Sequence, residues 1–324
     1  MSQIQMNVHG YEFQNTTVSL LKSQLSLFNY RKRWGMIYAL ATLAGMFTIP
    51  GAFASMMNSP QLLSQTILGL VTLPLSSLFI IIGMYVFNDL IDADLDKANG
   101  KKRPIPSGEV SKLQGWIFVI GTNALGIALS AVTANSISLL ISFSLVAIGI
   151  MYSAPRIAFK DKFMVKTISI AAAMMLCISL GSTSYWNHGD FNSMGIHILY
   201  PAIMLSIMVF ITSPFNDVAD VIGDRMAGRK TIPIVIGSEN TVKMSIILAA
   251  SMIAISWTAF FVSNTGWITP LLVSLVAILT IYNMSKTLKN LSNKEYVRSQ
   301  HKKSMPLHLL LQLALAVGAL LIFV

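Results

Sequence analysis

Long apolar stretches alternate with short polar segments along almost the whole chain. A helix needs about 20 residues to cross the roughly 30 Å hydrocarbon core of a bilayer, and most of these stretches reach that length. Helices are expected because an open strand edge cannot satisfy its hydrogen bonds in lipid. The pattern predicts nine spans, at residues 35–55, 65–88, 113–134, 136–155, 163–186, 193–215, 242–263, 267–284 and 306–324.

The composition supports a membrane protein rather than a soluble helical bundle. Of the 324 residues, 54% are hydrophobic and 11% are charged, whereas soluble domains carry about 25% charged residues. The single cysteine, Cys177, excludes a disulfide framework within one chain. We therefore expect an all-α, polytopic membrane domain at residues 35–324, preceded by a cytoplasmic segment at 1–34. That segment shows no cleavable signal-peptide pattern, so the first span is expected to act as its own signal.

The basic residues orient the predicted spans. All 23 lysines and arginines precede the first span or follow the second, fourth, sixth and eighth spans. The loops near Asn58, Ala134, His188 and Asn264 contain none. Since cytoplasmic loops are enriched in Lys and Arg, we expect a multi-pass protein of the cell membrane with its amino terminus inside and its carboxyl terminus outside. The net charge of +10 then indicates contact with anionic membrane lipids, and nucleic-acid binding is not expected.

Seven of the 13 acidic residues gather in two short clusters, each directly after an apolar stretch. The first cluster spans 88–96 and the second spans 217–224. Within them, residues recur at intervals of four, which places them on one helical face if the helices continue. Carboxylates at the end of a membrane helix are costly and are usually functional. We therefore expect the two clusters to form one shared site.

The side chains of these clusters favour a hard cation. Carboxylate and amide oxygens suit Mg²⁺ or Mn²⁺, and several ionised carboxylates in a half-buried site need cations nearby. An EF-hand is excluded, because Lys97 and Arg103 occupy the positions that require Gly and Glu. Since Mg²⁺ usually also binds phosphate oxygens, a diphosphate substrate fits. The predicted metal ligands are Asn88, Asp92, Asp96, Asp217, Asp220 and Asp224.

Basic residues adjoin both clusters, and others come from the loop after the fourth predicted span. Arg offers planar, bidentate contacts to phosphate oxygens and Lys offers a point charge. The alternative explanation of each one is that it only obeys the positive-inside rule. The predicted diphosphate-binding residues are Arg103, Arg156, Lys160, Arg225 and Lys230.

These motifs resemble those of the UbiA-type intramembrane prenyltransferases, and the resemblance covers almost the full chain. Residues 88–96 fit the pattern NDxxDxxxD and are followed by RPIPSG at 103–108. Residues 220–224 fit DxxxD and are followed by GxKTxP at 228–233. Residues 152–160 are similar to the segment YSxPxxxxK. The segment at 152–160 lies between the two acidic motifs. Three motifs in this chain order on nine predicted spans make the resemblance specific.

The resemblance implies nine helices around a central cavity and a Mg²⁺-dependent prenyltransferase. Its metal would bind the diphosphate of a polyprenyl donor, allowing the allylic C–O bond to ionise before a lipid or aromatic acceptor captures the cation. The candidate catalytic residues are Asp89, Arg103, Lys160 and Tyr152. Asp89 is a candidate base that is expected to point away from the face of Asn88, Asp92 and Asp96, and the alternative is that it caps a helix or pairs locally with an Arg. The expected cavity lining includes Met84, Tyr85, Phe87, Met151, Met174, Met175 and Met208.

The acceptor stays open at this point. The string at 223–233 looks most like the ether-lipid and chlorophyll branches of the family, which favours geranylgeranylglyceryl phosphate. The alternative is 4-hydroxybenzoate or another aromatic precursor of quinones. An ion- or proton-coupled transporter is a remote alternative, because such carriers usually hold charged residues near the bilayer midplane on interrupted helices.

Overall fold

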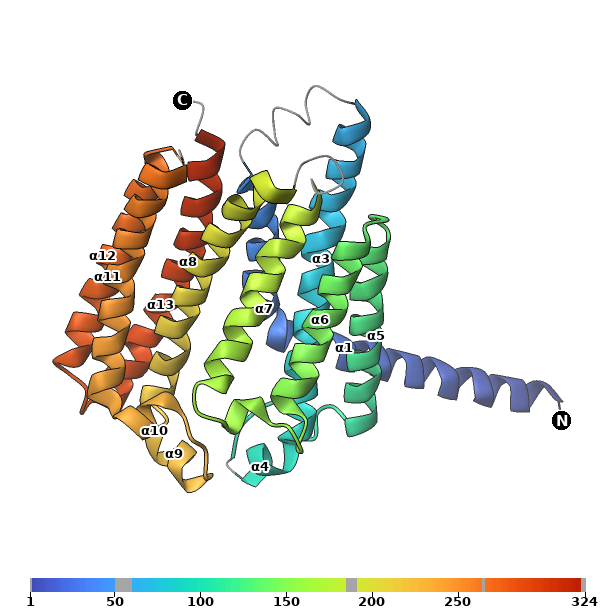
Figure 1. The fold of residues 1–324 in the computed structure, drawn as a ribbon. Coiled ribbons are helices and arrows are strands. Elements are labelled where there is room, and N and C mark those ends of the chain that lie inside the picture. Colours follow the sequence, from blue (N-terminus) through green and yellow to red (C-terminus); the bar gives the residue numbers. More distant parts are fainter. Residues whose placement is uncertain (1, 50–59, 99, 185–190, 264–265, 322–324) are drawn as a thin grey trace.

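Every regular element in the described part of the chain is a helix (Figure 1). The computed structural model describes residues 2–49, 60–98, 100–184, 191–263 and 266–321. The long helices are α1 (Ser2–Phe47), α3 (Pro60–Ile91), α5 (Lys112–Ala131), α6 (Ser136–Ser153), α7 (Val165–Ser182), α8 (Phe191–Val218), α11 (Ser238–Ser263), α12 (Ile268–Leu288) and α13 (Lys294–Leu320). Four short helices connect them: α4 (Ala93–Ala98), η1 (Phe159–Asp161), α9 (Val221–Met226) and α10 (Ile232–Ile236).

Eight helices of the described residues are long and apolar enough to cross a membrane, one fewer than the nine spans predicted. They are α3, α5, α6, α7, α8, α11, α12 and α13, and they correspond to the second to ninth predicted spans. The predicted first span, 35–55, falls on the apolar end of α1, which packs against α3, α7 and α13 and ends at Phe47. Residues 50–55 of that span lie outside the described part. Because α1 passes through residue 34 without a break, the domain boundary proposed there stays a prediction.

The last predicted span begins too late. We placed its start at Pro306, whereas α13 begins at Lys294. The first turns of α13 are rich in charge, but Val297, Gln300 and Ser304 are buried, so the helix is packed well before it becomes apolar. A hydropathy pattern locates only the apolar part of such a helix, so it places the start of the helix after the polar first turns.

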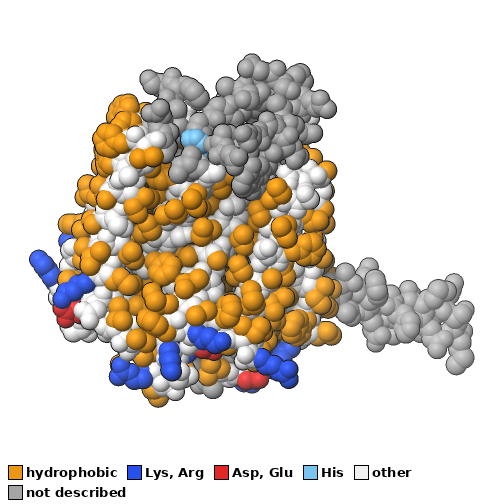
Figure 2. All heavy atoms as spheres, in the orientation of Figure 1, with side chains coloured by type: hydrophobic (Ala, Val, Ile, Leu, Met, Phe, Trp, Pro, Cys, Tyr) orange, Lys and Arg blue, Asp and Glu red, His pale blue; other side chains and the backbone are white. Residues whose placement is uncertain are grey.

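Apolar side chains cover the flanks of the bundle, and charged side chains gather at one end (Figure 2). That end carries α4, α9 and α10 in Figure 1. Large apolar residues stay exposed along the outer faces, such as Ile120 on α5 and Ile247 and Phe261 on α11. Soluble monomeric proteins rarely expose so large an apolar surface to water. The chain is therefore a multi-pass membrane protein. The loops near Asn58, His188 and Asn264, which guided its predicted orientation, lie outside the described residues.

Small residues let α1 and α7 approach closely. A Cβ added to Gly181 would overlap the carbonyl oxygen of Thr42, and one added to Gly45 would overlap the carbonyl oxygen of Ile178. Close backbone approach at small residues is the usual basis of helix pairing in membranes. This crossing holds the C-terminal part of α1 in place. Tyr38 lies one turn before Thr42 in this part and lines the central cavity.

The helices surround a central cavity of about 320 Å³, with lining residues from α1, α3, α6, α7, α8 and α13. Tyr85 and Met174 line it as predicted, and Met84 lines a neighbouring cavity of about 120 Å³ that also touches Tyr85. Phe87 does not line either of these cavities. It follows Tyr85 by two residues, about 200° around the helix, and packs against Trp116 with the ring centroids 5.7 Å apart. Met208 is also absent from these linings and is fully buried in the helical core.

Candidate active site

The first acidic cluster continues the helical register of α3 across a turn into α4. The backbone amide of Asp92 donates to the carbonyl of Asn88 at 3.0 Å, and that of Asp96 donates to the carbonyl of Asp92 at 2.8 Å. In the second cluster the amide of Asp224 donates to the carbonyl of Asp220 at 2.9 Å. The four-residue register predicted from the sequence is confirmed in both clusters.

Two carboxylates of the first cluster, Asp89 and Asp96, are buried and share one guanidinium. Arg103 Nη1 lies 2.7 Å from Asp89 Oδ1 and 2.5 Å from Asp96 Oδ2. Arg31 of α1 also binds both oxygens of Asp89, with Nε donating at 2.7 Å to Oδ2, and Lys101 Nζ lies 2.8 Å from Asp96 Oδ1. The expectation that Asp89 points away from its cluster was wrong, and the alternative that it pairs with an Arg is confirmed. Residues seven apart lie almost on one helical face, so Asp89 and Asp96 meet the same cation.

The third loop of the predicted site packs against the first cluster. Lys160, in η1, is buried and donates from Nζ to Asp92 Oδ1 at 2.6 Å. Asn88 donates from its side-chain amide to Ser153 Oγ at 3.1 Å. The end of α6 and the segment after it thus contact Asn88 and Asp92, which Arg103 does not bind.

The second cluster distributes its three carboxylates among three different partners. Asp217 Oδ1 accepts from Lys166 Nζ at 2.6 Å, and Asp220 Oδ1 accepts from Arg298 Nη2 at 2.7 Å. Asp224 Oδ1 lies 3.3 Å from Arg229 Nη1. The partners come from α7, from α13 and from the loop after α9. Each carboxylate therefore ties the end of α8 or the segment after it to another element.

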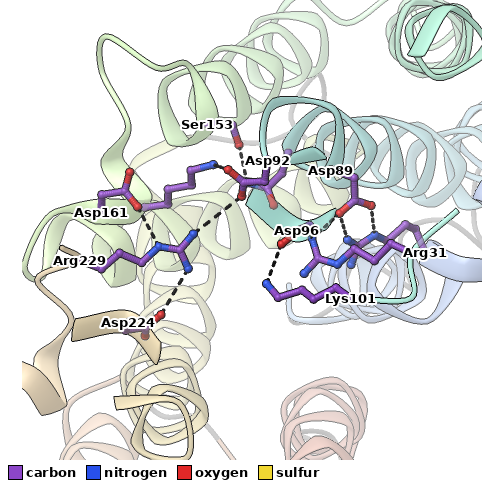
Figure 3. Close-up of polar contacts among 12 residues, drawn as sticks. Arg31, Asp89, Asp92, Asp96, Lys101, Ser153, Asp161, Asp224 and Arg229 are labelled. Carbon is purple, nitrogen blue, oxygen red and sulfur yellow. Dashed lines mark hydrogen bonds and ion pairs between the residues drawn. The ribbon is translucent and has the colours of Figure 1, made fainter. Parts of the chain in front are cut away.

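Arg229 joins the two clusters (Figure 3). Its Nη2 lies 4.0 Å from Asp92 Oδ2, and its Nη1 contacts Asp224. Its Nε lies 3.2 Å from Asp161 Oδ1. Burial by itself would lower the pKa of Arg229, but the three carboxylates together raise that pKa above its ordinary value. The predicted meeting of the two clusters is thus observed, with a cation between Asp92 and Asp224.

The donor set of this meeting point fits a hard divalent cation in its chemistry. Asp92 and Asp224 offer carboxylate oxygens to one positive group, and Asn88 adds an amide oxygen beside them. Among the described residues, no three His, Cys, Asp or Glu side chains come together closely enough to hold a metal ion by themselves. Lys and Arg contact the carboxylates instead, so that metal binding requires these cations to move away.

The ion pairs around the two clusters fall into four separate groups, and we call all of them together the ion-pair network. Among the described residues it contains seven carboxylates and seven cations. Its carboxylates are Asp89, Asp92, Asp96, Asp161, Asp217, Asp220 and Asp224, and its cations are Arg31, Lys101, Arg103, Lys160, Lys166, Arg229 and Arg298. The formal charges balance, which keeps the cost of burying them low.

The network adjoins the central cavity. Arg31, Arg103, Lys166 and Asn88 line the cavity together with Tyr152. Aromatic rings form much of the remaining wall, where Trp34 stacks on Tyr85 with the centroids 5.9 Å apart. Charge at one end and aromatic walls beyond it suit a ligand with an anionic head and an apolar chain.

Comparison with known proteins identifies the family. The sequence model of the UbiA prenyltransferase family matches residues 34–322. The chain belongs to this family. A digeranylgeranylglyceryl phosphate synthase of Saccharolobus solfataricus is 28% identical over 180 residues, which is 56% of this chain and 61% of that relative. The match thus spans about three fifths of the relative's length.

Solved structures share the UbiA fold. An apo UbiA homolog from Aeropyrum pernix aligns with a TM-score of 0.69 at 17% identity, covering 89% of this chain and 97% of the homolog. A UbiA homolog from Archaeoglobus fulgidus bound to DMAPP and Mg²⁺ aligns with a TM-score of 0.60 at 21% identity, covering 91% of this chain and 99% of that protein. At these identities the alignments establish the fold.

Three predicted diphosphate-binding residues lie outside the ion-pair network. The side chains of Arg156, Arg225 and Lys230 are exposed, and no ion pair found among the described residues includes them. The backbone amide of Lys230 donates to the carbonyl of Asp161 at 3.1 Å, which holds its loop against η1. Their role in binding a donor stays a prediction.

Sequence reasoning missed several members of this UbiA site. Arg31 belongs to a basic run that obeys the positive-inside rule, and 58 residues separate it from Asp89, so no local pattern reveals the pair. Lys166 and Arg298 were assigned to topology for the same reason. Asp161 did leave a signal, because it directly adjoins Lys160, which the motifs had already selected. Arg229 was not missed, since it is one of the basic residues that follow the second cluster.

Proposed function

We propose that this chain is a Mg²⁺-dependent prenyltransferase that moves a polyprenyl group from an allylic diphosphate to an acceptor in the membrane. The observation that carries the proposal is the position of Arg229 between Asp92 and Asp224, with Lys160 on the same aspartate, beside an aromatic cavity. The homolog from Archaeoglobus fulgidus that shares this fold is bound to DMAPP and Mg²⁺, which supports the same ligand class here.

The ion-pair network explains how donor and metal would bind together. A diphosphate adds negative charge to a network whose charges already balance, so a cation must accompany it. Lys160 and Arg229 can turn from carboxylates to the diphosphate oxygens, for which they are suited as a point charge and a planar fork. Asp92 and Asp224, released by that exchange, would then hold Mg²⁺ with Asn88. Asp96, Asp217 and Asp220 remain proposed ligands around this centre.

The chemistry is ionisation of the allylic C–O bond and capture of the resulting carbocation by the acceptor. Mg²⁺ supplies Lewis-acid stabilisation of the departing diphosphate. Lys160, Arg103 and Arg229 provide fixed positive charge where negative charge develops, and such preorganised contacts are usually the largest catalytic contribution. Tyr85 and Tyr152 line the cavity where the cation would form, and their ring faces attract positive charge.

We further propose a lipid acceptor, geranylgeranylglyceryl phosphate. The string at 223–233 supports it, and so does the name of the relative in Saccharolobus solfataricus, digeranylgeranylglyceryl phosphate synthase. In this assignment the chain belongs to ether-lipid rather than quinone biosynthesis.

The test is direct. Purified protein with Mg²⁺ and geranylgeranyl diphosphate should release diphosphate and yield a doubly prenylated glyceryl phosphate by mass spectrometry when geranylgeranylglyceryl phosphate is supplied. Prenylation of 4-hydroxybenzoate instead would move the acceptor to the quinone class. Full activity in excess chelator would contradict the metal-dependent mechanism. Cation uptake into proteoliposomes without any diphosphate release would favour a transporter.

We also propose that the charged end of the bundle faces the cytoplasm, with the amino terminus inside and the carboxyl terminus outside. The grouping of Lys and Arg at one end supports this orientation (Figure 2). On a Cys177→Ala background, single cysteines near Lys101 and Lys162 should react only with reagents that enter the cell. Cysteines near Ala134 should react with impermeant reagents from outside, and the reverse pattern would invert the proposal.

A further inference from the structure

One wall of the central cavity is polar although it lies within membrane-spanning helices. Its six residues are Thr212, Ser213 and Asn216 of α8 and His301, Ser304 and His308 of α13. On α13 the three are spaced by three and four residues, so they share one helical face. We call them the polar wall. None of its members belongs to the ion-pair network or to the motifs of the sequence, and polar side chains in membrane helices usually have a function.

The polar wall contains unused hydrogen-bonding groups. Among the described residues, eight buried side-chain atoms have no hydrogen-bond partner, and three of them belong to this wall: Ser213 Oγ, His301 Nδ1 and His308 Nε2. His308 is 7% exposed. An unpaired buried polar group costs about 1–3 kcal/mol, and native proteins contain few of them. A half-turn of either imidazole ring exchanges its nitrogen and carbon positions, so a nitrogen can face the cavity.

The chemistry of the polar wall fits a ligand that donates hydrogen bonds. Thr212 and Ser304 donate their own hydroxyl hydrogens to helix carbonyls, at 2.9 Å to Met208 and 2.6 Å to His301. Each oxygen can therefore still accept a hydrogen bond. A neutral imidazole adds one acceptor nitrogen. The nearby cation Lys166 is engaged by Asp217 at 2.6 Å. Hydroxyl groups are the donors that match such a wall.

Both helices of the polar wall also carry a proline at this level. Pro214 follows Ser213 in α8, and Pro306 lies between Ser304 and His308 in α13. A proline donates no hydrogen bond to the carbonyl four residues earlier. Membrane helices tolerate this where side chains, water or a cavity satisfy the backbone.

We propose that the polar wall is the acceptor subsite, where it binds and orients the hydroxyl-bearing head of the acceptor lipid. This inference rests on the proposed function and extends it to residues that no motif contains. Asn88 and Arg103 line the same cavity, so a head held by the polar wall shares one chamber with the proposed donor site. His308 and Ser304 are positioning residues: they fix the acceptor and take no part in ionising the donor.

The kinetic test separates the two substrates. His308→Leu should raise the KM for geranylgeranylglyceryl phosphate about tenfold, as expected for a lost hydrogen bond in a buried site. The KM for geranylgeranyl diphosphate should change less than about twofold. Ser304→Ala should act in the same direction and serves as a smaller change if His308→Leu does not fold. His197→Leu is the matched control, because His197 lies on α8 but does not line the central cavity. Donor and acceptor KM rising together would overturn the assignment.

Binding can be measured without turnover, because Trp34 lines the same cavity. Titration of purified protein with geranylgeranylglyceryl phosphate should change tryptophan fluorescence saturably, and Trp34→Phe should remove the signal. His308→Leu should weaken this binding about tenfold, while His197→Leu should not. Equal binding by His308→Leu and the parent protein would refute the subsite, as would a response to 4-hydroxybenzoate alone. Lipid binding that depends on His308, in a protein that releases no diphosphate, would contradict the proposed function but not the subsite.

Discussion

The two acidic clusters use the same kind of side chain in different surroundings. In the first cluster Asp89 and Asp96 are almost completely buried, and each contacts two cations. In the second cluster each carboxylate has one cationic partner, and the pair of Asp220 with Arg298 is about half exposed. Burial makes an ion pair costly to break, whereas exposure to water weakens it.

The carboxylates of the ion-pair network fall into two roles that differ in burial. The pairs of Asp89 with Arg31 and Arg103 hold α1, α3 and the loop after α4 together, so they maintain the shape of the site. Asp92 and Asp224 share the less tightly held Arg229, so they can change partners when a ligand binds. A cluster that looks uniform in sequence thus contains both structural and exchangeable carboxylates.

The largest expected effect is on folding, at Asp89. Asp89→Asn should lower the free energy of unfolding by about 3–5 kcal/mol, because it leaves the buried Arg31 guanidinium without its countercharge. Thermal unfolding in detergent measures the change. The double variant Asp89→Asn/Arg31→Met should recover much of the loss, since the buried charge is then gone. A single variant as stable as the parent protein would show that the Arg31 pair does not hold the site together.

The second prediction concerns the exchangeable carboxylates. Asp92→Asn and Asp224→Asn should each lower turnover at least about a hundredfold, the scale of removing one electrostatic contact to the transition state, while the protein still folds and purifies. Asp94→Asn is the control within the same cluster, because Asp94 is exposed and pairs with an exposed lysine, Lys112. Its diphosphate release should match that of the parent protein. Near-normal turnover in both active-site variants would remove the two clusters from the mechanism.

The third prediction compares buried and exposed cations. Lys160→Gln should weaken donor binding or slow ionisation by about 1.5–3 kcal/mol, the usual value of a hydrogen bond to a charged group, and leave the acceptor KM unchanged. Lys230→Gln replaces an exposed lysine and should alter the donor parameters less than about twofold. Donor saturation curves decide between them. If Lys230→Gln matched Lys160→Gln in its effect, the exposed basic residues would join the binding site.

The smallest effect is expected at the exposed pair of the second cluster. Arg298→Gln should change the free energy of unfolding by less than about 1 kcal/mol, because solvent screens the pair with Asp220. The melting temperature at low and high salt measures it, and the small loss should shrink further as salt is added. A loss as large as that of Asp89→Asn would show that the two clusters do not differ as proposed.

The sequence by itself determined which segments are helices in the membrane and which clusters lie together at their ends. The apolar lengths predicted eight of the helices because hydrophobic matching to a bilayer is a local property of the chain. The motifs predicted that both clusters and the loop carrying Lys160 come together in one site, since both clusters follow helices that end on the same side. It did not predict the burial of Asp89 or the early start of α13.

Tertiary structure alone decided the partners. Arg31 pairs with Asp89 because α1 packs directly against α3. His301 and His308 line the cavity because α13 turns that face toward α8. Contacts of this kind depend on helix rotation and packing, which are set by side chains far apart in the chain. Hydropathy and motif spacing describe each helix alone, so they contain no information about which faces will meet.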